Sequence, residues 1–154
     1  MKRLTKRGNM KEYGILWDFW RKCEEFSEFF EKIIGNKMWT LQEFWMKRLL
    51  KEESFAIVAP TGIGKTSFGI VACLYLASKG KRCYIILPTS LLVEHVRSHM
   101  ETAVKRLGLE VNIAFYHSGL RGKEKKRSTE EIEKKEYDIL ITTNRFLIRN
   151  FEIL

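Results

Sequence analysis

A run of glycines followed by lysine and threonine constrains this chain more than any other feature of its sequence. Residues 59–66 read APTGIGKT and follow a short apolar run, residues 54–59, with the composition of a strand buried on both faces. A helical pattern begins at Thr66, so the string lies between a predicted strand and a predicted helix. This is the sequence context that a phosphate-binding loop, or P-loop, requires.

The residue types in this loop match what the binding of a nucleoside triphosphate needs. Gly62 and Gly64 allow the backbone to turn so that amide groups face a β-phosphate, and the helix N-terminus adds partial positive charge. Lys65 supplies a full charge to the phosphates, and the Thr66 hydroxyl is a ligand for Mg²⁺. Lys65 and Thr66 are therefore candidate catalytic residues. The predicted triphosphate site consists of Pro60, Thr61, Gly62, Ile63, Gly64, Lys65, Thr66 and Ser67. The alternative is a glycine-rich turn with an incidental lysine.

Beyond the loop, short apolar runs alternate with helical patterns. Each predicted helix is followed by a glycine, Gly80 or Gly108, where a left-handed C-cap is needed. This alternation predicts an α/β fold, with a parallel sheet covered by helices on both faces. Residues 122–136 are polar throughout and form either an exposed helix or a mobile loop. Strands are predicted over residues 82–87, 111–116 and 137–142, and helices over residues 66–79 and 91–107.

Two further helices are predicted before the loop. The first covers residues 15–34, and its glutamates would repel anionic lipid, so we favour packing against the main domain over binding to a membrane surface. The second covers residues 41–50, with Thr40 as its N-cap and Glu43 completing a capping box. The apolar stripe of the first helix consists of Leu16, Trp20, Cys23, Phe26, Phe30 and Ile33. We divide the chain into a helical N-terminal extension, residues 1–38, and a nucleotide-binding lobe, residues 39–154.

The charge balance points to polyanionic partners. A formal net charge of +9 attracts nucleic acid or anionic membranes, although a merely basic, soluble surface fits equally well. No apolar run resembles a signal peptide or a membrane span, so we expect a cytoplasmic protein with no membrane partner. The cysteines Cys23, Cys73 and Cys83 form no CxxC pair, so no zinc is expected.

The loop and three other segments resemble the ATP-binding lobe of superfamily 2 helicases and translocases, a RecA-like P-loop fold. The form AxTGxGKT is similar to motif I of that family. Gln42 resembles the glutamine of its Q-motif, whose amide pairs with N6 and N7 of adenine, so the resemblance implies ATP as the nucleotide. Residues 88–92 (PTSLL) are similar to motif Ia, and residues 138–147 (DILITTNRFL) lead into a segment similar to motif Ib.

Motifs Ia and Ib contact the nucleic-acid backbone in this family. The resemblance therefore implies contacts with DNA phosphates at Thr89, His95, Thr143 and Arg145. His95 stands where many members have glutamine, and Asn144 and Arg145 replace the usual Pro-Gly of motif Ib. Hydroxyls and amides at strand ends suit phosphate contacts, which position a strand without reading its sequence. Helix capping is the alternative role of Thr89 and Thr143.

Within superfamily 2, residues 39–69 and 146–154 look like the helicase-like region of reverse gyrases. These enzymes of hyperthermophiles couple this ATPase to a type IA topoisomerase and introduce positive supercoils into DNA, and the single glutamine of the chain agrees with such a source. The resemblance implies ATP and Mg²⁺ as cofactors, DNA as a partner, and the remainder of the motor and the topoisomerase domain, in the same chain or in another. The alternatives are a helicase without topoisomerase activity and a non-catalytic nucleotide- or nucleic-acid-binding module.

The acidic motif II of the family is expected beyond residue 154, so the lobe is predicted to be incomplete. In phosphoryl transfer of this type, acidic residues hold Mg²⁺ and position the attacking water, so we expect the chain alone to bind ATP rather than to hydrolyse it. Asp138 opens its predicted strand, and strand geometry separates it by roughly 15 to 20 Å from the end where the catalytic acids lie. We therefore reject Asp138 for that role.

Two further groups of residues are weaker candidates, one for a metal site and one for contact with DNA. His95 and His99 lie four residues apart on one predicted helix, but the sequence offers no third ligand, which argues against a metal site. A basic cluster precedes Glu130, Glu131 and Glu133, so a solvated face is favoured over contact with DNA phosphates. The cluster consists of Arg121, Lys123, Lys125, Lys126 and Arg127.

Overall fold

The computed structural model describes residues 11–150, which belong to two compact units, Met1–Lys65 and Thr66–Leu154. The start of the predicted N-terminal extension, residues 1–10, and the end of the segment that resembles reverse gyrases, residues 151–154, lie outside the described residues. Across the described residues, no helix combines the length and the apolar character of a bilayer span.

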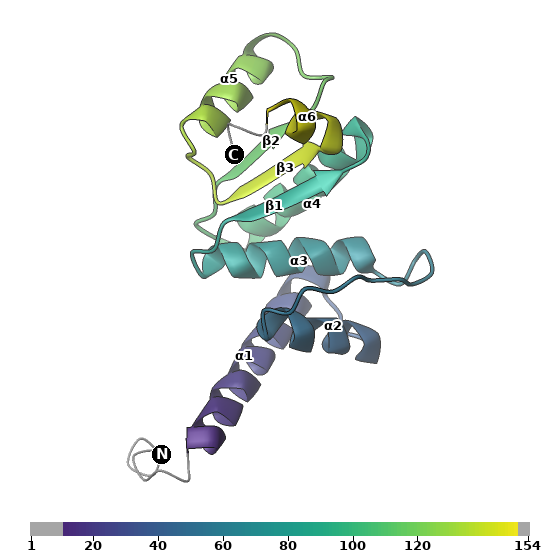
Figure 1. Ribbon diagram of the computed structural model, residues 1–154, viewed down its shortest axis with the longest axis vertical. Coiled ribbons are helices and arrows are strands. Elements are labelled where there is room, and N and C mark those ends of the chain that lie inside the picture. Colours follow the sequence, from purple (N-terminus) through teal and green to yellow (C-terminus); the bar gives the residue numbers. More distant parts are fainter. Residues whose placement is uncertain (1–10, 151–154) are drawn as a thin grey trace. The chain divides into compact units, whose positions relative to one another are not determined.

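The first unit contains two helices, α1 (Lys11–Ile34) and α2 (Thr40–Leu50), which pack against each other (Figure 1). Both predicted helices are therefore confirmed. α1 ends at Gly35, whose φ of 84° lies in the left-handed region that favours glycine.

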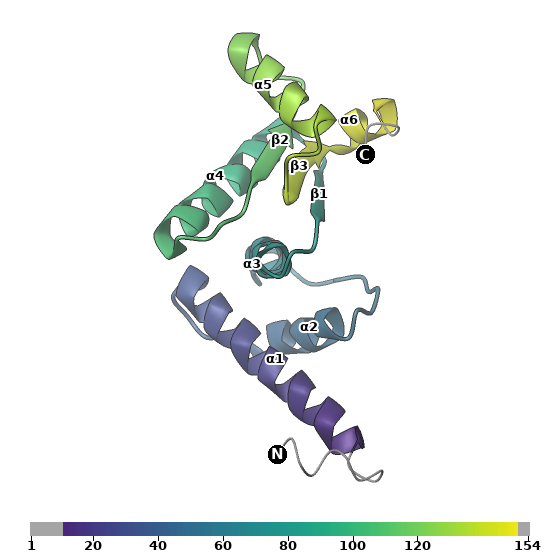
Figure 2. The same ribbon diagram turned by 90° about the vertical axis from the view of Figure 1, so that its left-hand side faces the viewer.

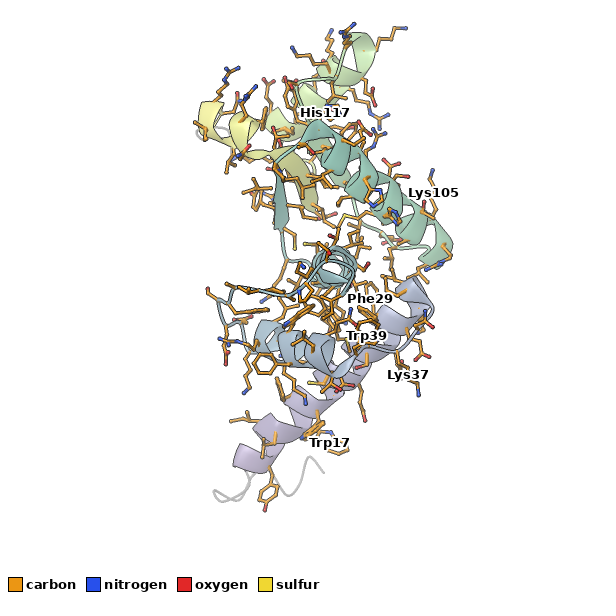
Figure 3. The ribbon with its side chains drawn as sticks, turned by 90° about the vertical axis from the view of Figure 1, so that its right-hand side faces the viewer. Trp17, Phe29, Lys37, Trp39, Lys105 and His117 are labelled. Carbon is orange, nitrogen blue, oxygen red and sulfur yellow. The ribbon has the colours of Figure 1, made fainter. Side chains whose placement is uncertain are left out.

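The apolar stripe of α1 is buried only in its second half. Cys23, Phe26 and Phe30 are buried, whereas Leu16 and Trp20 in the first half are 54% and 58% exposed. Trp17, beside the stripe, is also exposed (Figure 3). The 11 residues of α2 extend over roughly 16 Å, so this helix covers only part of the 24-residue α1. The second half of the stripe thus lies on the side of α1 that packs within the first unit, and packing against the main domain stays a prediction.

The predicted capping box of α2 is wrong by one residue. Trp39, not Thr40, is the N-cap, and Gln42 takes the position expected for Glu43. The Gln42 side-chain Oε1 accepts a hydrogen bond from the Trp39 backbone N–H at 3.0 Å. This bond satisfies one of the amide groups that a helix start leaves without a partner.

The strand predicted at residues 54–59 is not formed. These residues have an irregular conformation, and Val58 is 98% exposed. An apolar run becomes a strand only when a neighbouring strand provides hydrogen bonds, and the strands found among residues 11–150 all pair with one another in the second unit.

The second unit contains a three-stranded parallel sheet in the order β1-β3-β2. The strands are β1 (Cys83–Leu87), β2 (Ile113–Tyr116) and β3 (Ile139–Thr143). All three were predicted, with bounds that differ by one or two residues. β3 is central, and its Leu140 lies opposite Tyr84 of β1 and Ala114 of β2. β1 is an edge strand within the described residues, and its Tyr84 and Ile86 are 42% and 46% exposed.

Four helices accompany the sheet: α3 (Lys65–Ser78), α4 (Ser90–Leu107), α5 (Gly122–Glu133) and α6 (Asn144–Arg149). α4 lies on one face, and α5 and α6 lie on the other (Figure 2). The predicted α/β fold, a parallel sheet with helices on both faces, is therefore confirmed. The polar segment 122–136 is a helix through most of its length. The six-residue α6 was not predicted, because a helix of this length is too short for its apolar residues to repeat with helical spacing.

The two faces of the sheet have separate cores. On the α4 face, Val93, Val96 and Met100 are almost fully buried. On the opposite face, Ile132 of α5 packs with side chains of the sheet and the preceding loop, namely Ala114, Tyr137 and Leu140. These cores fix the carboxyl ends of the three strands relative to one another.

Candidate nucleotide and nucleic-acid sites

The P-loop has the backbone conformation that its glycines permit. Gly62 and Gly64 have φ angles of 85° and 81°, which side chains with a Cβ rarely adopt. α3 begins at Lys65, directly after the loop, so the helix side of the predicted context is confirmed, whereas the strand predicted before the loop is not formed. The amides of a turn that enters a helix are available to an anion, because a helix start leaves them without intrahelical acceptors.

The Lys65 ammonium group lies against the loop itself. Its Nζ donates to the carbonyl oxygen of Ala59 at 2.6 Å and to that of Pro60 at 2.7 Å. An ammonium group has three donors, so one remains for an incoming phosphate oxygen. The lysine is therefore held at the loop with its charge uncompensated by any carboxylate among residues 11–150.

Gln42 connects the start of α2 to the P-loop. Besides accepting from Trp39, its side chain donates from Nε2 to the Ile63 carbonyl oxygen at 3.4 Å, and only 6% of the residue is exposed. A Cβ at Gly64 would lie 2.6 Å from this Nε2. One hydrogen of Nε2 and one lone pair of Oε1 remain, which are the two groups that pairing with adenine requires.

Thr66 and Ser67 are the next residues of α3 and belong to the second unit. Thr66 is exposed and Ser67 is half-buried. Within residues 11–150 no group of three His, Cys, Asp or Glu side chains is placed to hold a metal ion. A single hydroxyl fits Mg²⁺ when the ion is bound mainly by phosphate oxygens and water, as it is with nucleotides.

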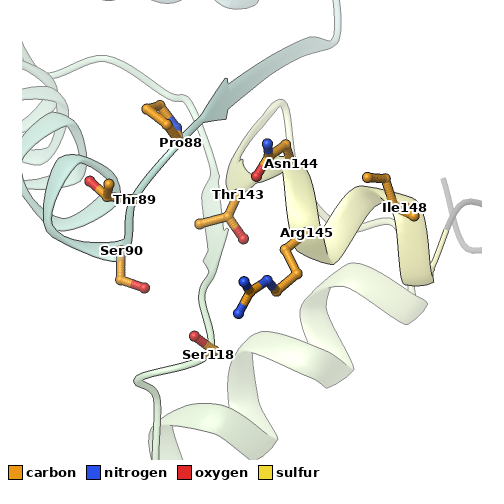
Figure 4. A pocket seen from close by; sticks show the side chains of 8 residues that line it. All are labelled: Pro88, Thr89, Ser90, Ser118, Thr143, Asn144, Arg145 and Ile148. Carbon is orange, nitrogen blue, oxygen red and sulfur yellow. The ribbon is translucent and has the colours of Figure 1, made fainter.

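A polar pocket lies in the second unit, at the carboxyl ends of all three strands (Figure 4). Its volume is about 470 Å³. Three of the four residues predicted to contact nucleic acid, Thr89, Thr143 and Arg145, line it together. The complete lining is Pro88, Thr89, Ser90, Ser118, Thr143, Asn144, Arg145 and Ile148.

The two threonines of the pocket are helix N-caps. The Thr89 hydroxyl oxygen accepts from the Leu92 backbone N–H at 3.3 Å, and that of Thr143 accepts from the Phe146 N–H at 3.4 Å. The capping alternative is therefore confirmed for both residues. Each hydroxyl keeps its own hydrogen, which is free to be donated to a phosphate oxygen.

Arg145 brings positive charge to the pocket. Its guanidinium points into the space between Ser90 and Ser118 (Figure 4). Among the described residues no carboxylate pairs with this guanidinium. An exposed arginine without an acidic partner, surrounded by hydroxyl groups, is suited to binding phosphate.

His95 lies outside this pocket. It is exposed on α4 and its ring packs against that of His99, with 4.5 Å between the ring centroids. The structure thus separates His95 from the other three predicted residues. No third metal ligand accompanies the two histidines within the described part of the chain.

Ser118 is a pocket residue that the sequence reasoning missed. It follows β2, so the rule that ligands bind beyond the carboxyl ends of parallel strands would have found it. The neighbouring His117 is 7% exposed and holds this segment in place. Its Nδ1 accepts from the Gly119 N–H at 3.1 Å, and its Nε2 lies 2.6 Å from the Glu94 carboxylate on α4.

Comparison with known proteins identifies relatives of this chain. The family model for DEAD/DEAH box helicases matches residues 39–153. The reverse gyrase of Methanocaldococcus jannaschii is 46% identical over 142 residues, covering 92% of this chain and 9% of that protein. The reverse gyrase of Pyrobaculum aerophilum is 43% identical over 143 residues, covering 92% and 12%. That of Pyrococcus horikoshii is 39% identical over 151 residues, covering 98% and 9%. The chain thus spans about a tenth of the length of these curated relatives.

Proposed function

From the premise that this chain belongs to the DEAD/DEAH box helicase family, we propose that it is the ATP-binding part of the helicase-like motor of a reverse gyrase. The observation that carries the proposal is the P-loop, with two glycines at positive φ and Lys65 held at its carbonyl groups. The family match from residue 39 supports a boundary between a helical extension, residues 1–38, and an ATP-binding lobe, residues 39–154.

In this proposal the residues of the P-loop bind the triphosphate. Backbone amides from Gly62 onward would hold the β-phosphate, and Lys65 would offer it the ammonium hydrogen that the Ala59 and Pro60 carbonyl groups leave free. Thr66 would hold Mg²⁺, which neutralises charge on the phosphates during phosphoryl transfer. Ser67 follows on the same helix.

The carboxylates needed for hydrolysis are not supplied by the aspartates of this chain. Its two aspartates are Asp18 and Asp138. Asp138 lies just before β3 and accepts from the Asn112 N–H at 2.8 Å, at the strand end away from the polar pocket. We therefore propose that the chain binds ATP, and that hydrolysis and positive supercoiling require the remainder of the motor and a topoisomerase domain.

Gln42 is expected to select adenine. In Gln42→Ala, affinity for ATP should fall by roughly tenfold relative to affinity for GTP, because two hydrogen bonds to the base are lost. Competition of ATP and GTP against a fluorescent nucleotide measures this ratio. If Gln42 only supports the loop through Ile63, both nucleotides will weaken equally and the ratio will stay unchanged.

Arg145 is expected to bind the DNA backbone. Arg145→Ala should weaken the binding of a fluorescein-labelled single-stranded DNA by roughly tenfold at low salt, because a charged contact with phosphate is lost. Fluorescence anisotropy at several salt concentrations measures the effect. Arg149→Ala is the matched control, since Arg149 is exposed on the same helix but does not line the pocket. Equal losses in both variants would contradict a specific contact, and failure of the unsubstituted chain to bind DNA would refute this part of the proposal.

A further inference from the structure

The α5 helix carries two groups of basic residues with different surroundings. Its buried residues are Ser128 and Ile132, in the second half, and Ile132 packs on the sheet. The basic residues precede this anchored part and are all exposed. Their number alone does not distinguish a solvated face from a binding surface, so the position of each carboxylate partner decides between the two.

The later basic residues are paired within the helix. Arg127 donates from Nε to Glu131 at 2.8 Å, and the hydrogen bond with Glu131 raises the pKa of Arg127. Lys126 lies 4.0 Å from Glu130. These pairs reproduce the neutralisation expected from the sequence, but they account for only two of the five cations.

Glu124, the one acid in the first turn of α5, is bound by a residue of another helix. Arg97 of α4 donates from Nη1 to Glu124 at 3.1 Å and from Nε to Glu101 at 2.8 Å. Its guanidinium also lies 3.7 Å from the centre of the Phe115 ring. Although burial lowers the pKa of Arg97, the bonds to Glu101 and Glu124 outweigh this and raise it. Glu124 is therefore not available to neutralise its neighbours on α5.

Arg121, Lys123 and Lys125, here called the α5 cations, remain without a carboxylate partner in the part of the chain that the structure describes. They follow the pocket directly along the chain. Ser118 lines the pocket, and three residues of extended chain bring Arg121 to within roughly 11 Å of it. A nucleic-acid strand carries one charge per roughly 3.4 Å, so a few nucleotides span this distance.

We propose that the α5 cations bind the phosphate backbone of a nucleic-acid strand where it leaves the polar pocket at the strand ends. This inference rests on the proposed function, because the pocket supplies the neighbouring contacts. The contact is independent of sequence, since exposed cations reach phosphates and not base edges. An anionic membrane is the less favoured partner, because a helix that binds a membrane surface needs an exposed apolar face, and the apolar Ile132 of α5 is buried against the sheet.

The test compares two double substitutions in the full chain that remove the same charge from the same helix. The variant K123A/K125A removes two α5 cations, and the control K126A/R127A removes the two residues paired with glutamate. Binding of single-stranded DNA is measured by anisotropy over a series of salt concentrations. The first variant should lower the slope of log K against log salt by roughly 1.4, or 0.7 for each lost phosphate contact, and the control by much less. All four residues are exposed, and circular dichroism checks that both variants remain helical.

The other outcomes overturn the inference in distinguishable ways. If both variants lower the slope equally, only overall charge matters and the α5 cations have no contact of their own. If neither changes the slope while Arg145→Ala weakens binding, DNA binds the pocket but not α5, and the proposed function is retained. If K123A/K125A loses binding to phosphatidylserine vesicles but not to DNA, the partner is a membrane and the inference is wrong. If the unsubstituted chain binds no DNA, this inference and the nucleic-acid part of the proposed function both fail.

Discussion

Replacing Lys65 by alanine is expected to weaken the binding of a fluorescent ATP analogue by roughly a hundredfold, or about 3 kcal/mol. The substitution removes the only ammonium group at the P-loop among the described residues, where it lies at the carbonyls of Ala59 and Pro60. Backbone amides and the helix start would still attract phosphate, so a residual affinity is expected. Titration of the analogue against the chain, followed by displacement with unlabelled ATP, measures the change.

Lys105→Ala provides the matched control for this measurement. Lys105 is an exposed lysine in the last turn of α4 (Figure 3), and its removal changes the net charge by the same amount. We expect this variant to bind the analogue like the unsubstituted chain. Equal affinities for the Lys65→Ala chain and the unsubstituted chain would show that the loop is an ordinary turn, and the assignment of an ATP site would then be wrong.

Replacing Leu140 by alanine is expected to destabilise the second unit by about 3 kcal/mol. Leu140 is 0% exposed at the centre of β3 and lies between Tyr84 and Ala114 on the neighbouring strands. Its truncation leaves a cavity in the core that holds the pocket-forming strand ends together. Hydrogen exchange of the amides at residues 139–143 should accelerate by roughly a hundredfold, since a tenfold change in an opening equilibrium corresponds to about 1.4 kcal/mol.

Tryptophan fluorescence is the wrong probe for this effect, because Trp17, Trp20, Trp39 and Trp45 all lie in the first unit. Ile148→Ala serves as the control, since Ile148 is 78% exposed and its truncation leaves no cavity. A Leu140→Ala chain with unchanged exchange at β3 would show that the strand is not part of a packed core.

The sequence predicted those features that depend on neighbours along the chain. The strands of the second unit and the glycine ends of α3 and α4 follow from short-range patterns, and all of them are formed. The failure at residues 54–59 has a different cause. An apolar run specifies that a segment prefers to be buried and extended, whereas a strand also needs a partner that is distant in sequence.

The same distinction applies to the sites. Thr89, Thr143 and Arg145 were chosen from local motifs, and the sheet brings them into one pocket because parallel strands end at the same edge. Ser118 was missed because no motif marks it. The capping box was misplaced because Thr40 and Glu43 are the residue types that a capping box favours, whereas α2 is capped one residue earlier, at Trp39, and Gln42 accepts from the Trp39 N–H.

The open side of β1 affects how the chain behaves at high concentration. Among residues 11–150 no strand pairs with the outer side of β1, and an edge strand with half-exposed Tyr84 and Ile86 is a template onto which another extended chain can add. Lys81 and Arg82 immediately precede this strand, and positive charges at such a position repel a second copy that approaches in register. Lowering the ionic strength therefore strengthens this repulsion and keeps the molecules apart, whereas high salt screens it and promotes edge-to-edge assembly.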